Sequence, residues 1–397
     1  MIVLFLAVIL LGMVGYVSLS GFIKPLGWQL VNGYYGNNVP EDSSTYDRII
    51  TIRNEIESSF NNVFYKNEYI ELNGLAQRIL GRRIVCDADR SNDVVKLDNG
   101  YLTFVGQKID IDWQADNIKR LHDILVERET DFLYVLAPYK IDPTDPELPY
   151  VIDDYNNENA DILIDHLRYT GIDCIDLREE IKSADKNHYE MFFLTDHHWT
   201  PESGFWAFGV IGRHLNERYG FSIDESLFYV SSYRLETKEN WFLGSLGKRV
   251  GTLYGGVDDF TYLLPKFETD FEVLWPLKDV IKFGSFEKVL FDKKLMEERD
   301  YTSNTYTIYT DDYELQIIKN NLNTEKRVLL VRDSFACVVS PFLSLGCKQL
   351  DVMDLRHYND KSLIEYIDET NPDIVIILYN PGTLANHSGG EKLYDFY

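Results

Sequence analysis

The segment VLLVRDSFACVVSPFLSLGCKQLDVM, residues 328–353, carries the pattern that decides the fold. Val328–Val331 is a short apolar run of strand length, Phe335–Leu345 is predicted to be a helix, and Gln349–Met353 is predicted to be the next strand. The alternation continues to another apolar strand at Ile374–Tyr379. Strands that alternate with helices of about 10–15 residues are typical of a mostly parallel sheet with helices on both faces.

The residues before this segment follow the same rhythm until a long irregular stretch. Trp113–Glu129 is predicted to be a helix, Phe132–Ala137 a buried strand and Ile172–Leu177 a short strand. Residues 221 to about 320 contain glycine-rich segments and no clean period, so we expect an insertion there that lies over the sheet. The prediction is one α/β domain of three layers, αβα, spanning residues 46–397 and containing that insertion.

The N-terminal residues differ from the rest of the chain in having no charge. Residues 1–23, MIVLFLAVILLGMVGYVSLSGFI, contain no charged side chain. Because about 20 helical residues span the hydrocarbon core of a bilayer, we predict an uncleaved transmembrane anchor here. Residues 24–45 would then be a linker. A cleaved signal peptide is the alternative, since the small residues VSLSG follow the apolar run, although no basic residue precedes it.

The composition excludes some classes of protein. The 397 residues include 39 Lys and Arg against 64 Asp and Glu, which gives a formal net charge of −25. A nucleic-acid-binding protein would need a basic surface, so we expect no nucleic-acid partner. At 45% hydrophobic and 26% charged residues, the chain has the composition of a folded protein rather than a disordered one.

The first candidate site is the segment TDHHWT, residues 195–200. In an extended backbone, residues two apart face the same way, so Asp196 could accept a hydrogen bond from one ring nitrogen of His198. The other ring nitrogen would remain free as a base, which is the orienting half of a catalytic triad. A polar cap on the helix that begins near Pro201 is the alternative.

The second candidate is Ser334, in the segment RDSF at residues 332–335. It follows a predicted parallel strand and begins a predicted helix, where open α/β sheets place their sites. Backbone N–H groups at a helix start stabilise developing negative charge, and a serine nucleophile needs such donors together with a base. Helix capping by Asp333 or Ser334 is again the alternative.

Two further residues end predicted strands on the same edge of the sheet. Asn380, in the segment LYNPG at residues 378–382, could donate its amide to an oxyanion, although a plain turn explains the segment equally well. Lys140, in the segment APYK at residues 137–140, is a candidate substrate contact, with a solvated loop lysine as the alternative.

Taken together, these segments resemble a known family. The run FFLTDHHWTPESGFWAF (residues 192–208), followed downstream by DSF (333–335), is similar to the DHHW family. That family resembles the AlgX/AlgJ group of SGNH-hydrolase-like proteins, which O-acetylate exported polysaccharides. The resemblance covers about Glu68 to Asn380, and its further matches are IELNGLAQRILG (70–81), KLDNGYLTF (96–104), VLAPYKIDPTDPELP (135–149), CIDLREEI (174–181) and WFLGSLGKRVGTLYGGVDDF (241–260).

The resemblance implies an SGNH-hydrolase-like fold and a role for each triad residue. Ser334 would be the nucleophile, His198 the general base and Asp196 its orienting acid. The Asp-x-His pair precedes the serine in this group, a permuted order relative to ordinary SGNH hydrolases, and this chain has that order. Gly244-Ser245-Leu246 stands where relatives have a motif like Gly-Asp-Leu; the acid is missing, so no role is transferred to it.

The function implied by the resemblance is serine-dependent O-acetyl transfer or acetyl-ester hydrolysis on an exported polysaccharide or oligosaccharide. We expect no cofactor and no metal. The implied partner is a membrane-bound O-acyltransferase that supplies acetyl, and the implied location is outside the cytoplasm, at the cell surface or in the periplasm. Because the whole net charge of −25 lies after the uncharged N-terminal segment, a neutral glycan is favoured over a polyanionic one.

Two alternatives stay open at this point. One is a non-catalytic glycan-binding or scaffolding component of a polysaccharide-modification complex. The other is a DHH-type metal-dependent phosphoesterase, which would share Asp196-His197-His198 and could use Asp87-Ala88-Asp89 as a second acidic motif. No glycine-rich GGGH-like segment closes the chain, which disfavours the phosphoesterase.

Overall fold

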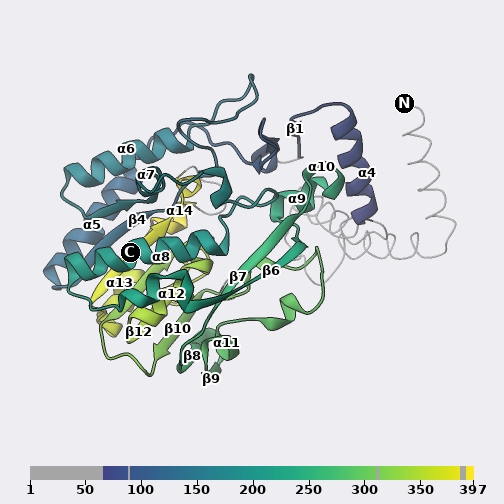
Figure 1. The fold of residues 1–397 in the computed structure, drawn as a ribbon. Coiled ribbons are helices and arrows are strands. Elements are labelled where there is room, and N and C mark those ends of the chain that lie inside the picture. Colours follow the sequence, from purple (N-terminus) through teal and green to yellow (C-terminus); the bar gives the residue numbers. More distant parts are fainter. Residues whose placement is uncertain (1–65, 88–89, 310–312, 385–389) are drawn as a thin grey trace, which may run out of the picture. The chain divides into compact units, whose positions relative to one another are not determined.

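The computed structural model describes residues 66–87, 90–309, 313–384 and 390–397. The predicted anchor at residues 1–23 and linker at 24–45 lie outside the described residues. Among the helices that are described, none combines the length and the apolar character needed to cross a membrane. Residues Glu71–Tyr397 form one unit, and the architecture below is that of this unit (Figure 1).

An eight-stranded sheet forms the centre of the unit, in the order β5-β4-β13-β11-β12-β10-β8-β9. The first five strands in this order are parallel, and the last three are antiparallel to their neighbours. Their bounds are β4 Asp131–Leu136, β5 Cys174–Asp176, β8 Phe271–Trp275, β9 Val280–Gly284, β10 Leu315–Asn320, β11 Arg327–Arg332, β12 Gln349–Met353 and β13 Ile374–Tyr379.

The sheet is therefore mixed, which corrects the prediction of a mostly parallel sheet. Within the antiparallel part, β8 and β9 form a hairpin joined by one short turn, Pro276–Lys278, which ends at Asp279 in the left-handed conformation. A connection this short can only reverse the chain, whereas parallel strands need a crossover of about a dozen residues or more.

Helices cover both faces of the sheet, as expected for three layers (Figure 1). Alternate side chains of each central strand point to opposite faces, and both sets are buried. Leu329, Val331 and Ile377 share a core with α5 (Asp112–Glu127), α6 (Asn156–Tyr169) and α13 (Leu363–Thr370). Val328, Leu330 and Ile376 share the opposite core with α7 (Leu177–Ser183), α8 (Pro201–Tyr219) and α12 (Ser340–Leu343).

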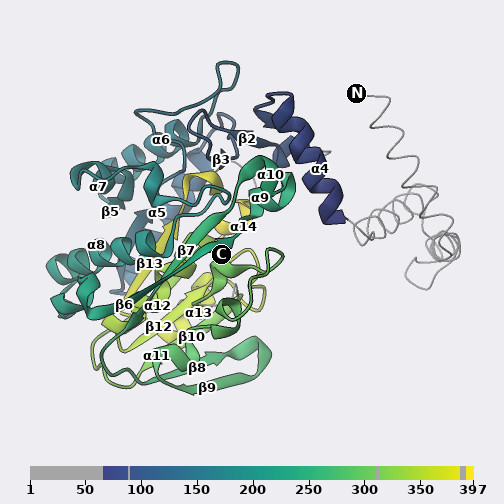
Figure 2. The same ribbon diagram turned by 45° about the vertical axis from the view of Figure 1, so that its right-hand side comes forward.

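The region 221–320 only partly matches the expected insertion. β6 (Tyr233–Phe242) and β7 (Asp258–Pro265) form a separate antiparallel ribbon, which runs alongside α8 in Figure 2 and shares its core through Phe260 and Leu263. The later strands of the region, β8 to β10, extend the sheet instead of lying over it. Short helices α9 (Ser245–Val250) and α10 (Thr252–Gly255) connect β6 to β7.

The predicted helix at Phe335–Leu345 is broken into three short pieces. A 3₁₀ turn covers Ser334–Val338, α12 covers Ser340–Leu343, and a second 3₁₀ turn covers Ser344–Gly346. Pro341 explains the break, since it has no N–H to donate to the preceding turn and is tolerated at the start of a helix. The remaining elements are α4 Lys66–Ile79, β1 Ile84–Val85, β2 Val94–Lys96, β3 Leu102–Thr103, α11 Phe286–Val289 and α14 Gly390–Leu393.

Candidate active site

Ser334 lies at the carboxyl end of β11, which stands between β13 and β12 in the parallel part of the sheet. Its backbone begins the 3₁₀ turn, and the carboxylate of Asp333 caps that turn by accepting the Phe335 N–H at 2.8 Å. The Ser334 side chain is partly exposed, whereas its chain neighbours Asp333 and Phe335 are buried. The joint between strand and turn therefore presents one hydroxyl group at the edge of the sheet.

Asn380 supports this joint. Its backbone N–H and its side-chain amide both donate to the second carboxylate oxygen of Asp333, each at 2.7 Å, and its side-chain oxygen accepts the Gly382 N–H at 2.8 Å. Burial raises the pKa of Asp333, while hydrogen bonds from Asn380 and Phe335 and the charge of Arg356 oppose that shift. One hydrogen of the Asn380 amide is thus engaged by Asp333, and an oxyanion role for the second hydrogen stays a prediction.

Asp196 and His198 are brought to the same place from a loop. His198 Nδ1 lies 2.6 Å from Asp196 Oδ1, and His198 Nε2 lies 2.7 Å from Ser334 Oγ. Asp196 and His198 therefore lie next to Ser334 as predicted, but their backbone is not extended. The segment bends, and Asp196 Oδ1 also accepts the backbone N–H of His198 at 3.0 Å, so that one oxygen fixes both the turn and the ring.

The carboxylate of Asp196 is held ionised within a buried setting. Burial favours the neutral acid, but the rings of His198 and His197 and the hydrogen bonds from His198 and from the Ser245 N–H outweigh it. They hold the pKa of Asp196 well below its usual value. An ionised carboxylate at this position can fix the tautomer of His198 and stabilise the imidazolium that forms when the ring takes a proton.

Buried polar groups far away in sequence anchor the loop. The carboxylate of Asp258 accepts the N–H groups of Leu194 and Thr195 and the Thr195 hydroxyl. Gly244 packs directly on Asp196, since a Cβ at this glycine would lie 2.3 Å from the Asp196 Cβ. The Ser245 N–H donates to Asp196 Oδ2 at 2.5 Å.

Lys140 is also part of this anchor and is not a substrate contact. Its side chain is 1% exposed, and Nζ donates to the backbone oxygens of Leu102 at 2.7 Å, Leu194 at 3.4 Å and Asp196. Burial lowers the pKa of Lys140 to about 7, with the charges of Asp258 and Asp196 opposing the shift. The predicted position on the sheet edge is correct, but the ammonium group points into the protein.

Aromatic rings enclose the His198 imidazole. The Tyr306 ring stacks on it with a centroid distance of 4.0 Å and an interplanar angle of 14°, and the Phe335 ring lies 5.2 Å away. Trp199 Nε1 donates to the Phe335 carbonyl oxygen at 2.9 Å. This hydrogen bond joins the loop of His198 directly to the turn of Ser334.

A metal site at Asp196-His197-His198 fits these contacts poorly. One potential ligand atom from each residue lies within 4.8 Å of the others. However, both ring nitrogens of His198 already face hydrogen-bond partners, Asp196 and Ser334. The second acidic motif of the phosphoesterase alternative is described only at Asp87, which is exposed. The donor set therefore favours a hydrogen-bonded triad over a metal cage.

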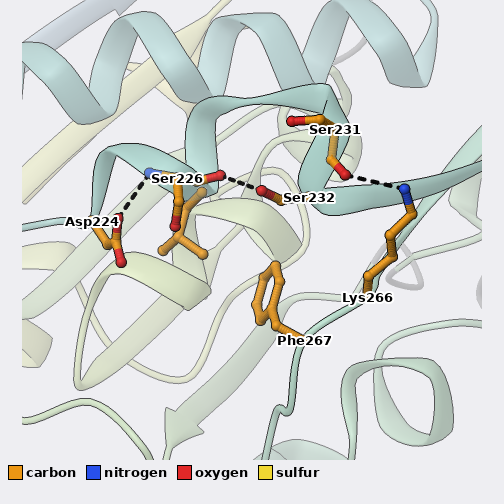
Figure 3. Close-up of a pocket in the computed structure, with 7 residues that line it drawn as sticks. Asp224, Ser226, Ser231, Ser232, Lys266 and Phe267 are labelled. Atoms are coloured by element: carbon orange, nitrogen blue, oxygen red, sulfur yellow. Dashed lines mark hydrogen bonds between the residues drawn. The ribbon is translucent and has the colours of Figure 1, made fainter.

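A pocket of about 380 Å³ lies among residues that the sequence did not indicate (Figure 3). Its polar groups are already paired: Lys266 Nζ donates to the Ser231 oxygen at 3.0 Å, and Ser232 Oγ donates to the Ser226 oxygen at 2.7 Å. None of the predicted site residues lines it. This pocket is therefore not the predicted site.

Sequence reasoning missed the residues that hold the loop in place. Gly244 and Ser245 approach Asp196, and Asp258 approaches Leu194 and Thr195, all from positions about 50–60 residues further along the chain. The sequence pattern places Ser245 where relatives carry an acid and predicts no contact for it. Its backbone N–H and its hydroxyl, which lies 3.1 Å from His197 Nδ1, give it two contacts with the DHH segment.

Comparisons with known proteins agree with this fold. Residues 100–238 match the family model described as the SGNH hydrolase-like domain of the acetyltransferase AlgX. The structure is similar to that of Bacillus cereus PatB1, with 22% identity, a TM-score of 0.63, and coverage of 77% of this chain and 99% of PatB1. It is also similar to a DHHW family protein from Eubacterium siraeum, with 16% identity, a TM-score of 0.55, and coverage of 78% and 96%.

A lower similarity is found to the O-acetyltransferase domain of Pseudomonas putida AlgJ, with 13% identity, a TM-score of 0.46, and coverage of 74% of this chain and 92% of that domain. No curated protein matches this chain in sequence. The family match includes Asp196 and His198 and ends before Ser334. The predicted resemblance to the DHHW and AlgX/AlgJ proteins is thus confirmed: residues 100–238 carry the AlgX-type SGNH hydrolase-like sequence, within an α/β fold shared with PatB1 and the DHHW family protein.

Proposed function

We propose that this protein is a serine-dependent O-acetyltransferase or acetylesterase that acts on a polysaccharide or oligosaccharide. The observation that carries the proposal is the hydrogen-bond chain from Asp196 through His198 to Ser334, with distances of 2.6 and 2.7 Å. The similarity of residues 100–238 to the acetyltransferase AlgX supports acetyl as the transferred group.

In the first half-reaction, Ser334 Oγ attacks the carbonyl carbon of an acetyl ester, and its proton passes to His198 Nε2. The tetrahedral intermediate then collapses. The bond to the donor oxygen breaks, the leaving alcohol takes the proton from His198, and acetyl-Ser334 remains. Asp196 stabilises the imidazolium between these two steps.

In the second half-reaction, a sugar hydroxyl or water attacks acetyl-Ser334 and gives its proton to His198 Nε2. Collapse returns that proton to Ser334 Oγ and releases the acetylated sugar or acetate. The backbone N–H of Ser334 has no acceptor among the described residues and stands at the start of a turn. It is therefore the donor that we assign to the oxyanion.

We further propose that the reaction takes place outside the cytoplasm, on an exported glycan. The uncharged residues 1–23 support this location as an anchor or export signal. A membrane-bound O-acyltransferase would supply the acetyl group, and the acidic composition after residue 23 favours a neutral glycan.

The test compares the purified wild-type protein with Ser334→Ala, using Ser183→Ala on the surface of α7 as a matched control. With p-nitrophenyl acetate, Ser334→Ala should lose at least about 10³-fold in kcat/KM with unchanged thermal unfolding, and the control should match the wild type. Because a structure of PatB1 carries a sulfonyl adduct, a sulfonyl fluoride followed by peptide mass spectrometry is the matching label.

We expect the sulfonyl label on Ser334. A label on another residue, or full activity in Ser334→Ala, would overturn the triad. Glycan binding without any turnover in the wild type would favour the non-catalytic alternative, and a stoichiometric transition metal in the purified protein would favour the phosphoesterase.

A further inference from the structure

His197 is the residue of the DHH segment that the proposed mechanism does not use. Its side chain is 31% exposed, against 10% for His198, and the two ring centroids are 3.8 Å apart. The half-buried Phe104 ring flanks it with a centroid distance of 5.6 Å. His197 therefore presents an imidazole to solvent directly beside the base that we assign to Ser334.

The surroundings of Nδ1 fix the tautomer of this ring. His197 Nδ1 lies 3.1 Å from Ser245 Oγ and 3.3 Å from Asp196 Oδ1. A bare Nδ1 lone pair that faced an ionised carboxylate would be repelled, so Nδ1 carries the hydrogen and donates it to Ser245 Oγ. Burial and the neighbouring charge of His198 lower the pKa of His197, which keeps the ring neutral. Nε2 is then an acceptor.

No group among the described residues donates to this Nε2. The atom is a hydrogen-bond acceptor on a partly exposed ring whose centroid lies 3.8 Å from that of His198, the proposed base for the acceptor alcohol. The attacking hydroxyl gives its proton to His198, so a second hydroxyl on the adjacent carbon of the same molecule is the group that can reach His197.

We propose that His197 binds the acceptor of acetyl transfer through a hydrogen bond from a hydroxyl group vicinal to the one that is acetylated, with Asp196 and Ser245 fixing the tautomer. The ligand class is a vicinal diol, as in a pyranose. This inference rests on the proposed function. In the transfer step a bond forms between the attacking oxygen and the acetyl carbon while the Ser334 Oγ–acetyl bond breaks, and His197 exchanges no proton.

The test measures how acetyl-Ser334 divides between two small alcohols and water, so it does not require the natural glycan. The full chain is given p-nitrophenyl acetate with either ethylene glycol, a vicinal diol, or 1,3-propanediol, and the acetylated diol and acetate are quantified by NMR. We expect the wild type to transfer acetyl to ethylene glycol in preference to 1,3-propanediol.

Two substitutions at position 197 separate a binding role from a structural one. A Gln amide reaches the place of Nε2, whereas an Asn amide reaches only the place of Nδ1. His197→Asn should therefore lower the ratio of transfer to hydrolysis about fivefold and lose the preference for ethylene glycol, while His197→Gln retains most of both. His166→Gln, on α6, is the control and should match the wild type.

Other outcomes would overturn the inference. One is an unchanged ratio of transfer to hydrolysis in His197→Asn. The other is a ratio that falls in His197→Gln but is retained in His197→Asn, since this result would assign the binding role to Nδ1. Failure of the proposed function has a different signature, because no acetyl-Ser334 would then form in the wild type, and both proposals would fall. Acetyl-Ser334 that forms normally but shows no diol preference would overturn only the role of His197.

Discussion

The nucleophile and the base of the candidate site are held in place by different means. Ser334 stands where a central parallel strand ends and a turn begins, so the hydrogen bonds of the sheet itself determine its position. Asp196 and His198 stand on an irregular loop, which is held by the buried side chains of Asp258 and Lys140 and by the close approach of Gly244.

This difference predicts different sensitivities. A strand end is determined by many backbone hydrogen bonds, and no single side chain near Ser334 should decide its position. A loop that depends on a few buried polar groups loses its geometry when one of them is removed, because the partners are left without hydrogen bonds in a medium of low polarity.

The largest effect is expected for Asp196→Asn. The variant keeps the shape of the side chain, but its amide can place a hydrogen toward His198 Nδ1 and so favour the wrong tautomer. We expect kcat/KM for p-nitrophenyl acetate to fall by about 10³–10⁴. Asp165→Asn on the exposed surface of α6 is the control. A loss below tenfold would mean that Asp196 does not orient the base.

The next largest effect is expected for Asp258→Ala, which removes the acceptor of three hydrogen bonds from Leu194 and Thr195. Buried donors without partners should lower the free energy of unfolding by about 2–4 kcal/mol, measured by urea denaturation. Activity should fall about 10–100-fold, because the loop of the base moves. Asp259→Ala, at the exposed neighbouring position, should change both much less. Equal effects at the two positions would contradict this account.

The same difference explains how much could be predicted from the sequence. The placement of Ser334 followed from a local pattern, an apolar strand followed by a turn-forming segment, and the structure has that arrangement. The contact of Asp196 and His198 with Ser334 could also be predicted, but only from the resemblance to a family. The extended backbone that we expected for the segment is not present. The bend depends on Asp258 and Gly244, whose positions no local pattern indicates.

Lys140 and Asn380 show the limit of reasoning from the sheet edge. Both residues follow strands that end there, as predicted, yet the Lys140 ammonium group points into the protein and one hydrogen of the Asn380 amide is engaged by Asp333. The direction of a side chain depends on which partners tertiary packing brings near it. For Lys140 these are three backbone carbonyl groups, and for Asn380 the carboxylate of Asp333.

The pH dependence of Lys140→Met should report its burial. Burial lowers the pKa of Lys140 to about 7 in the folded protein, against a usual value of about 10.4 in the unfolded chain. Between these values the unfolded state binds more protons, so the stability of the wild type relative to Lys140→Met should rise with pH. We expect a rise of about 1–3 kcal/mol from pH 7 to pH 10 in urea denaturation, with Lys119→Met on α5 as the control.

A difference between wild type and Lys140→Met that stays flat across this range would mean that the ammonium group is not held as the structure places it. A difference that falls with rising pH would mean that the pKa of Lys140 is raised in the folded protein. The charges of Asp258 and Asp196 would then outweigh burial. Activity at neutral pH should fall less than in Asp258→Ala, because Asp258 and Gly244 still hold the loop.

The smallest effect is expected for Asn380→Ala, at the joint of the nucleophile. The variant removes the 2.7 Å hydrogen bond to Asp333 and the bond from the Gly382 N–H, but the backbone N–H groups of Asn380 and Phe335 still reach the Asp333 carboxylate. We expect a loss of about 1 kcal/mol in the free energy of unfolding and less than a threefold fall in kcat/KM. Asn359→Ala, at an exposed position, is the control.

The result for Asn380→Ala tests the comparison most closely, because the sequence pattern also allowed an oxyanion role for this residue. An oxyanion donor acts in the transition state, and its removal costs about 10²–10³-fold in kcat with little change in stability. A large fall in kcat at constant stability would therefore identify Asn380 as an oxyanion donor. The site around Ser334 would then depend on a single side chain as much as the loop of His198 does. A small fall with a small loss of stability would leave the Ser334 N–H as the assigned donor, and the position of the nucleophile as a property of the sheet.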